Sequence, residues 1–163
     1  MQRTHSSHKA QAPTKKIVLL CDNVQGPANV GSIFRLADAF GVHEIIFGGK
    51  APDTSSSRLK KTARNTEKIV RFRESQNLIL AIQDLMSDGF TPIALEITSD
   101  SVPITKYPKN KNAIALIIGA EAHGVSQELL DIAHQTLHIP MLGVNSSMNV
   151  SQATGIALFA LTA

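Results

Sequence analysis

The 163-residue sequence contains a single cysteine and no apolar run long enough to cross a membrane. A lone cysteine excludes an intrachain disulfide, and the position of Cys21 in an apolar run predicts a buried thiol. The most apolar stretch, Ile156–Ala160, is far shorter than the roughly 20 residues of a membrane-spanning helix. The polar, basic N-terminus also lacks the apolar core of a secretory signal. We therefore expect a cytoplasmic protein.

Two common nucleotide-binding fingerprints are also missing. No Gly-x-Gly-x-x-Gly motif follows an expected strand, which argues against a dinucleotide fold. Residues 119–126 carry two glycines at the spacing of a phosphate-binding P-loop, but Val125 occupies the place of its lysine. We therefore expect no nucleoside triphosphate site. We also expect no metal site, because His5 and His8 have no acid or cysteine beside them.

Acidic residues are scarce around one basic segment. The formal net charge is only +3, but it is unevenly distributed. Between residues 58 and 73, Glu67 alone opposes seven basic side chains, namely Arg58, Lys60, Lys61, Arg64, Lys68, Arg71 and Arg73. Such clustering suits a polyanion better than a small neutral ligand. A merely solvated basic face would have the same composition, so charge alone does not decide between the two.

Short apolar runs alternate with helical patterns along the chain. Strands are expected at residues 17–20, 44–47, 69–72, 93–97, 114–118 and 136–139. Helices are expected at residues 29–40, 55–64, 78–86, 127–133 and 150–160. This alternation predicts one α/β domain with a parallel sheet over residues 16–163, preceded by a flexible basic tail over residues 1–15.

Three polar, glycine-containing segments follow expected strands, where parallel sheets bind their ligands. Residues 22–31 lead into a helix that Asn29 is expected to cap, and that helix carries Arg35 among apolar residues. Residues 119–124 form a tight turn that contains Glu121. Residues 139–149 hold more small polar side chains than one helix cap needs, which indicates a binding site.

In this order, the three segments resemble the motifs of the SpoU-TrmH family within the SPOUT methyltransferases. The matching residues are Asn29-Val30-Gly31 with Arg35 and 37–41, then Gly119 and Glu121 with Gly124, then Ile139-Pro140-Met141 with 147–151. The similarity runs from about Ile17 to the C-terminus. The departures are Ala120 where Asn is frequent, Met148 where Leu is usual, and Thr62–Asn65 where a small-residue segment is common.

The resemblance implies a parallel α/β fold with a deep C-terminal trefoil knot, and an RNA 2′-O-methyltransferase that uses S-adenosylmethionine. Positions matching the family's cofactor site are Leu95, Gly119, Ile139 and Met148. Those matching its catalytic site are Arg35, Asn29, Ser147, Asn149 and Glu121. It also implies a homodimer formed by the first and last helices. The chain resembles the catalytic domain alone, without the extra N-terminal RNA-binding domain of some relatives.

The expected substrate is tRNA or rRNA, with tRNA favoured because a lone dimeric domain suits a compact RNA. Lys60, Lys61, Arg64, Arg71 and Arg73 are expected to contact its phosphates. Arginine stays protonated in proteins, so we expect Arg35 to hold a phosphate and stabilise a developing alkoxide rather than to act as a base. Glu121 is expected to brace the loops, while Asn29, Ser147 and Asn149 hydrogen-bond Arg35, the ribose or the cofactor.

Three alternatives remain: a non-catalytic RNA-binding protein that keeps the fold, a small-molecule methyltransferase or other nucleotide-binding enzyme, and an enzyme that methylates a base. The coexistence of Arg35, Ser147 and Asn149 argues against the first. The basic segment argues against the second, and the motif set resembles the ribose type rather than the third.

Overall fold

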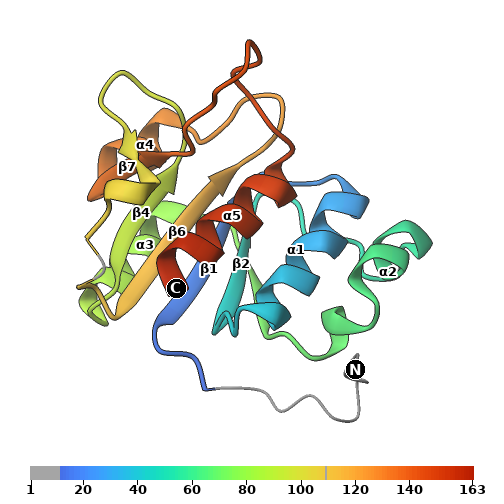
Figure 1. Cartoon of the computed structure of the whole chain (residues 1–163). Helices are drawn as coiled ribbons and strands as arrows, with labels where there is room; N and C mark the ends of the chain where they lie inside the picture. The colour runs from blue at the N-terminus through green and yellow to red at the C-terminus, as the bar shows by residue number, and fades with distance from the viewer. Residues whose placement is uncertain (1–11, 109) are drawn as a thin grey trace, which may run out of the picture.

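A computed structural model describes residues 12–108 and 110–163. Most of the expected basic tail, including His5 and His8, lies outside the described residues. The described chain forms a seven-stranded sheet in the order β3-β2-β1-β6-β4-β7-β5, with parallel pairing throughout (Figure 1). The strands are β1 Lys16–Asp22, β2 Glu44–Gly48, β3 Phe72–Ser75, β4 Thr91–Leu95, β5 Val102–Pro103, β6 Ala113–Gly119 and β7 Gln135–His138.

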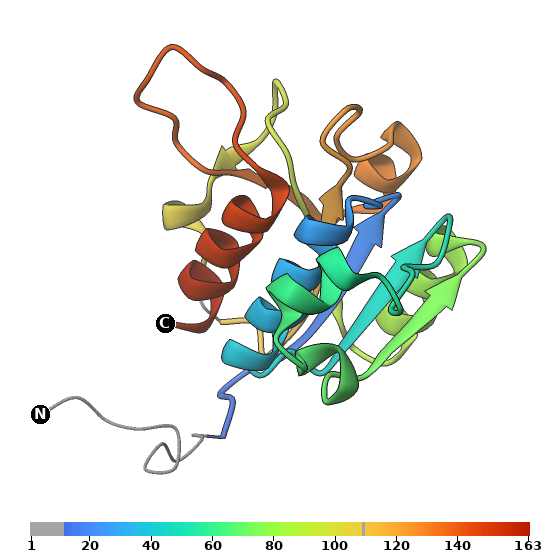
Figure 2. The same cartoon turned by 90° about the vertical axis from the view of Figure 1, so that its right-hand side faces the viewer.

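Helices cover both faces of the sheet, as the alternating pattern predicted (Figure 1, Figure 2). One face is covered by α1 (Pro27–Ala39), α2 (Ser57–Ala63) and α5 (Val150–Thr162), and the other by α3 (Leu78–Ser87) and α4 (Gln127–Ile132). Two short 3-10 helices, η2 (Thr66–Lys68) and η3 (Ile104–Lys106), complete the fold. None of the helices in the described ranges is long and apolar enough to cross a membrane.

The central strand β1 shows why these apolar runs form strands. Ile17, Leu19 and Cys21 pack into the core beneath α1 and α5, while Val18 and Leu20 pack into the core beneath α3 and α4. A strand buried on both faces needs a continuous apolar run rather than an alternating one. Cys21 is completely buried, as predicted, and desolvation raises the pKa of its thiol.

Three details differ from the expectations. Helix α1 begins at Pro27 after Gly26, so Asn29 lies in its first turn and is not the cap, because proline is well suited to the first helical position. Strand β3 starts at Phe72, because residues 66–68 form η2 and Ile69 is left exposed. The two-residue strand β5 was not predicted, since it is too short to show any periodicity.

Candidate active site

The carboxyl ends of three neighbouring strands meet at one edge of the sheet. Leu95 in β4 is in register with Ile118 in β6 and with Leu137 in β7. The loops that leave these strands, residues 96–101, 120–126 and 139–149, rise together at that edge (Figure 1, Figure 2). They enclose a cavity of about 200 Å³, which we call the loop cavity.

All four residues matched to the family's cofactor site line this cavity, namely Leu95, Gly119, Ile139 and Met148. Further apolar wall is supplied by Ile97, Ile118, Met141 and Val150. The polar part of the lining includes Glu96, Glu121, His138, Ser146 and Ser147. An apolar wall beside hydrogen-bond acceptors is suited to a ligand with a flat heterocycle and several donor groups.

The loop from Gly119 to Ser126 makes an unusually tight turn at the cavity. Ala120 and Gly124 form an isolated bridge, and the Gly124 N–H donates to the Ala120 carbonyl at 2.8 Å. A Cβ atom on Gly119 would overlap the backbone of Gly124, and Gly124 itself has a φ of +65°. The two glycines therefore have a steric purpose in this turn that requires no phosphate.

A chain of side-chain hydrogen bonds links the three sequence motifs. The Asn29 amide donates to Glu121, 92 residues away, and the Asn149 amide donates to the Asn29 Oδ1 atom at 2.9 Å. Asn149 also caps α5, since its Oδ1 atom accepts from the Ser151 N–H at 2.9 Å. Glu121, which lies exposed rather than buried, thus joins the tight turn to α1 and α5.

Arg35 lies in a second hollow, an open groove of about 1190 Å³ between α1, α2 and α5, which we call the helix groove. Its side chain is exposed and makes no hydrogen bond or ion pair within residues 12–108 and 110–163. Among the described residues, Arg35 is not the partner of Asn29, Ser147 or Asn149: Asn29 and Asn149 bind each other, and the Ser147 N–H donates to Asn145 at 3.2 Å. The guanidinium is therefore available to a ligand.

The helix groove also receives Lys61 and Arg64 from α2 and its C-terminal cap. Gly31 of the first motif allows this arrangement, because a Cβ atom there would overlap Thr62 and the Leu59 carbonyl. Helix α2 can therefore pack closely on α1, which places its two cations beside Arg35. The basic segment and the predicted catalytic arginine thus share one groove.

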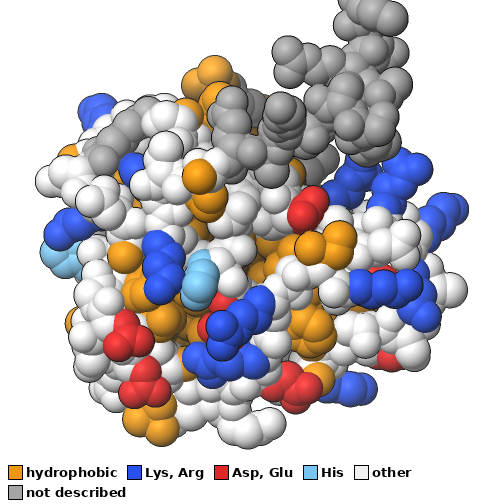
Figure 3. Space-filling model, turned by 90° about the horizontal axis from the view of Figure 1, so that it is seen from below, with side chains coloured by type: hydrophobic (Ala, Val, Ile, Leu, Met, Phe, Trp, Pro, Cys, Tyr) orange, Lys and Arg blue, Asp and Glu red, His pale blue; other side chains and the backbone are white. Residues whose placement is uncertain are grey.

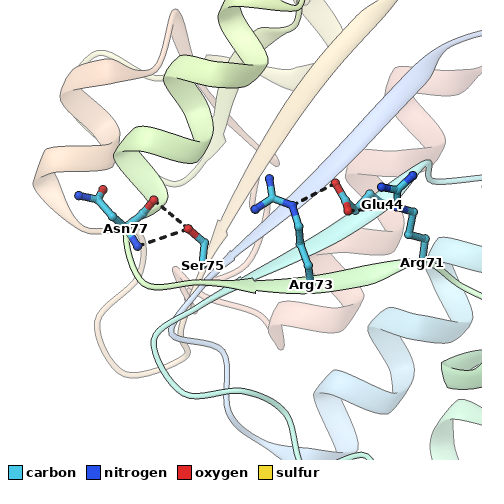
Figure 4. Close-up of polar contacts among 5 residues, drawn as sticks. All are labelled: Glu44, Arg71, Arg73, Ser75 and Asn77. Atoms are coloured by element: carbon cyan, nitrogen blue, oxygen red, sulfur yellow. Dashed lines mark hydrogen bonds and ion pairs between the residues drawn. The ribbon is translucent and has the colours of Figure 1, made fainter.

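Three of the predicted RNA contacts do not line the helix groove: Lys60, which is exposed on α2, and Arg71 and Arg73. Arg71 and Arg73 flank Glu44 at the amino end of the sheet, with N–O distances of 3.3 and 3.4 Å (Figure 4). Glu67, the acid within the basic segment, is buried, and Glu44 from outside the segment comes close to Arg71 and Arg73 because β2 and β3 pair. Viewed from below, Lys and Arg side chains form several separate groups interspersed with acids (Figure 3).

Met148 lies between the two hollows. It lines the loop cavity together with Ser147, and it lines the helix groove together with Ser151. A ligand in the cavity and a ligand beside Arg35 would therefore meet across this one side chain. The residues that the structure describes contain no cluster of acids, histidines or cysteine suited to holding a metal ion.

Sequence reasoning missed two ionisable residues of the loop cavity, Glu96 and His138. The Glu96 carboxylate accepts from the Val125 N–H at 3.0 Å, and His138 lies 3.0 Å from the Ser101 hydroxyl. The available signal was their position, because each lies at the carboxyl end of a strand where ligands bind.

The fold and the site together define the class of the chain. It is a parallel α/β protein with a loop-enclosed cavity at the carboxyl edge of its sheet and a basic groove beside that cavity. The profile of the SpoU rRNA Methylase family matches residues 16–159. The chain is therefore a member of that family, as its three motifs indicated.

Individual relatives agree with this assignment. The chain is 34% identical over 143 residues to the tRNA (guanosine(18)-2′-O)-methyltransferase of Thermus thermophilus, covering 88% of this chain and 72% of the relative. It is 32% identical to the 23S rRNA (guanosine-2′-O-)-methyltransferase of Escherichia coli, covering 87% and 58%. The crystal structure of an AdoMet-bound rRNA methyltransferase from Sinorhizobium meliloti superposes with a TM-score of 0.82 at 27% identity, covering 92% and 56%.

Proposed function

We propose that this protein transfers the methyl group of S-adenosylmethionine to a ribose 2′-hydroxyl of tRNA or rRNA. One observation carries the proposal: Met148 separates a cavity lined by the four cofactor positions from a groove that holds Arg35. A methyl donor and an RNA ribose bound in these two hollows would be neighbours. The activities named for the relatives from Thermus thermophilus and Escherichia coli support the same reaction.

The loop cavity fits the cofactor chemically. Leu95, Ile118 and Ile139 offer an apolar surface for adenine, and the Glu96 and Glu121 carboxylates suit hydroxyl donors and positive charge. When bound, S-adenosylmethionine supplies an activated methyl group. The chain's own residues must then position the ribose hydroxyl and stabilise the negative charge that develops on its oxygen.

Arg35 is suited to that second task. A guanidinium remains protonated, so it can hold the phosphate next to the target ribose and stabilise a forming alkoxide. Lys61 and Arg64 would bind neighbouring phosphates along the helix groove. Asn29, Glu121 and Asn149 act indirectly in this proposal, because their hydrogen bonds fix the positions of α1, α5 and the tight turn.

The experiment that tests this function is methyl transfer from isotope-labelled S-adenosylmethionine to RNA. Total tRNA and rRNA from cells lacking the protein are incubated with the purified chain and digested to nucleosides. We expect label in a 2′-O-methylnucleoside, whose position can then be mapped by comparing RNA from cells with and without the protein. Label in a methylated base, or cofactor binding without transfer to any RNA, would contradict the proposal.

The cofactor site can be tested separately at Gly119. The Gly119→Ala change should weaken S-adenosylmethionine binding at least tenfold, because the new methyl group would displace the turn at Gly124. The matched control is Gly143→Ala in the loop before α5, where an added Cβ atom meets nothing within 4 Å. Isothermal titration calorimetry measures the S-adenosylmethionine affinity of both variants. Equal affinities would rule out a cofactor site at Gly119. ATP should give no binding heat.

The finer features of the family also belong to this proposal. The segment after β7 returns past the other two loops of the cavity to reach α5, which packs on α1, and this path is compatible with a trefoil knot. A homodimer is supported by the unpartnered apolar side chains of α5, where Phe159 is 64% exposed and Ile156 42% exposed. Residues 16–163 would form the catalytic domain, and the cytoplasm remains the predicted location.

A further inference from the structure

We propose that Glu96 recognises the ribose of the cofactor, accepting hydrogen bonds from its 2′- and 3′-hydroxyl groups. This inference rests on the proposed function, since it assumes that S-adenosylmethionine occupies the loop cavity. Glu96 directly follows Leu95 at the carboxyl end of β4, is half-buried and lines that cavity.

The Glu96 carboxylate is held in place by backbone donors and still has capacity to spare. Its Oε2 atom accepts from the Val125 N–H at 3.0 Å, and its Oε1 atom accepts from the Ile97 N–H at 2.9 Å. A carboxylate offers about four acceptor positions, so two remain for a ligand. Both protein bonds come from backbone N–H groups, one on each carboxylate oxygen, and they orient the carboxylate before a ligand arrives.

The other titratable groups of the cavity are engaged differently. Glu121 is turned toward Asn29. The Ser101 hydroxyl lies 2.8 Å from the Thr98 carbonyl and 3.0 Å from Nδ1 of His138, so His138 has a protein partner on that nitrogen. No Lys or Arg lines the described cavity. Glu96 therefore has no cation beside it to compete with ligand donors.

A pair of neighbouring ribose hydroxyls matches this site. Vicinal hydroxyls present two donors side by side, and one carboxylate can accept both. Hydrogen bonds to an ionised acceptor are roughly twice as strong as neutral ones. An acidic residue performs this task in dinucleotide-binding folds, at the same edge of a parallel sheet. This chain lacks the glycine fingerprint of those folds but offers the same chemistry after β4.

The rival explanation is that Glu96 only holds the tight turn through Val125. The two roles are separated by combining protein variants with cofactor analogues. Calorimetry is performed on the wild type, Glu96→Gln and Glu96→Ala with S-adenosylhomocysteine and with its 2′-deoxy and 3′-deoxy forms. Glu74→Gln, an exposed acid in β3 outside the cavity, serves as the matched control. Circular dichroism confirms that each variant is folded.

We expect the wild type and Glu74→Gln to bind a deoxy analogue about tenfold more weakly than the parent ligand, as suits a charge-assisted hydrogen bond. In Glu96→Ala the deoxy penalty should shrink to about twofold, with Glu96→Gln in between. If the penalty stays tenfold while all three ligands weaken equally, Glu96 only positions the turn and the inference is wrong. A wild type without any deoxy penalty would also overturn it. A wild type that binds none of these ligands would instead refute the proposed function.

Discussion

Replacing Arg35 with alanine should lower the rate of methyl transfer by roughly 100- to 1,000-fold, the loss that follows removal of one group stabilising an oxyanion. The guanidinium has no partner among the described residues, so its loss should leave the fold intact. Cofactor affinity should also stay within about twofold, because Arg35 lines the helix groove and not the loop cavity.

Single-turnover kinetics with saturating cofactor and RNA separates this effect from weakened binding. Arg58→Ala is the matched control, because Arg58 is an exposed arginine of α2 that does not line the groove. Its rate should match that of the wild type. If Arg35→Ala retained most of the wild-type rate on a verified RNA substrate, Arg35 would not be the catalytic residue.

The second large effect is expected from neutralising Lys60, Lys61 and Arg64 together with glutamine. Each phosphate contact releases counterions, so the slope of log affinity against log salt should become less steep by about 0.7 to 0.9 per lost contact. At moderate salt the triple variant should bind RNA on the order of 100-fold more weakly. Cofactor binding should be unchanged, since none of the three residues lines the loop cavity.

The structure supplies a comparison for this experiment within the same basic segment. Arg71 and Arg73 share the Glu44 carboxylate, which competes with a phosphate for their guanidinium groups, so replacing both with glutamine should remove weaker phosphate contacts. We expect a smaller change of slope in the double variant than in the triple one. Filter-binding titrations at several salt concentrations measure both. An unchanged slope in the triple variant would mean that the basic segment is a solvated face, and it would not affect the enzymatic proposal.

The sequence predicted the layered α/β fold because short apolar runs and helical spacing are local signals. The four positions that the family resemblance assigns to the cofactor, Leu95, Gly119, Ile139 and Met148, line one cavity. Their contact with the cofactor stays a prediction. The boundary of β3 could not be predicted, since residues 66–72 contain apolar side chains that suit a strand or a turn equally well.

Contacts between distant segments were the harder part. The Asn29–Glu121 and Asn29–Asn149 hydrogen bonds join residues separated by 92 and 120 positions, and no periodicity reveals such pairs. The neutralisation of Arg71 and Arg73 depends on the pairing of β2 with β3, which brings Glu44 beside them. Charge counted along the chain therefore overestimated the basic surface, because charge is balanced across strands as well as along them.

The burial of Cys21 has a practical consequence. The thiol lies near the carboxyl end of β1, hydrogen-bonded strands flank β1 on both sides, and the accessible surface of Cys21 is zero. Only the thiolate reacts with alkylating reagents, and the raised pKa keeps the buried group protonated. Since the sequence has no other cysteine, every alkylated molecule records an opening of the sheet around β1. The protein thus carries a built-in chemical reporter of its own unfolding. No side chain of β1 lines the loop cavity or the helix groove.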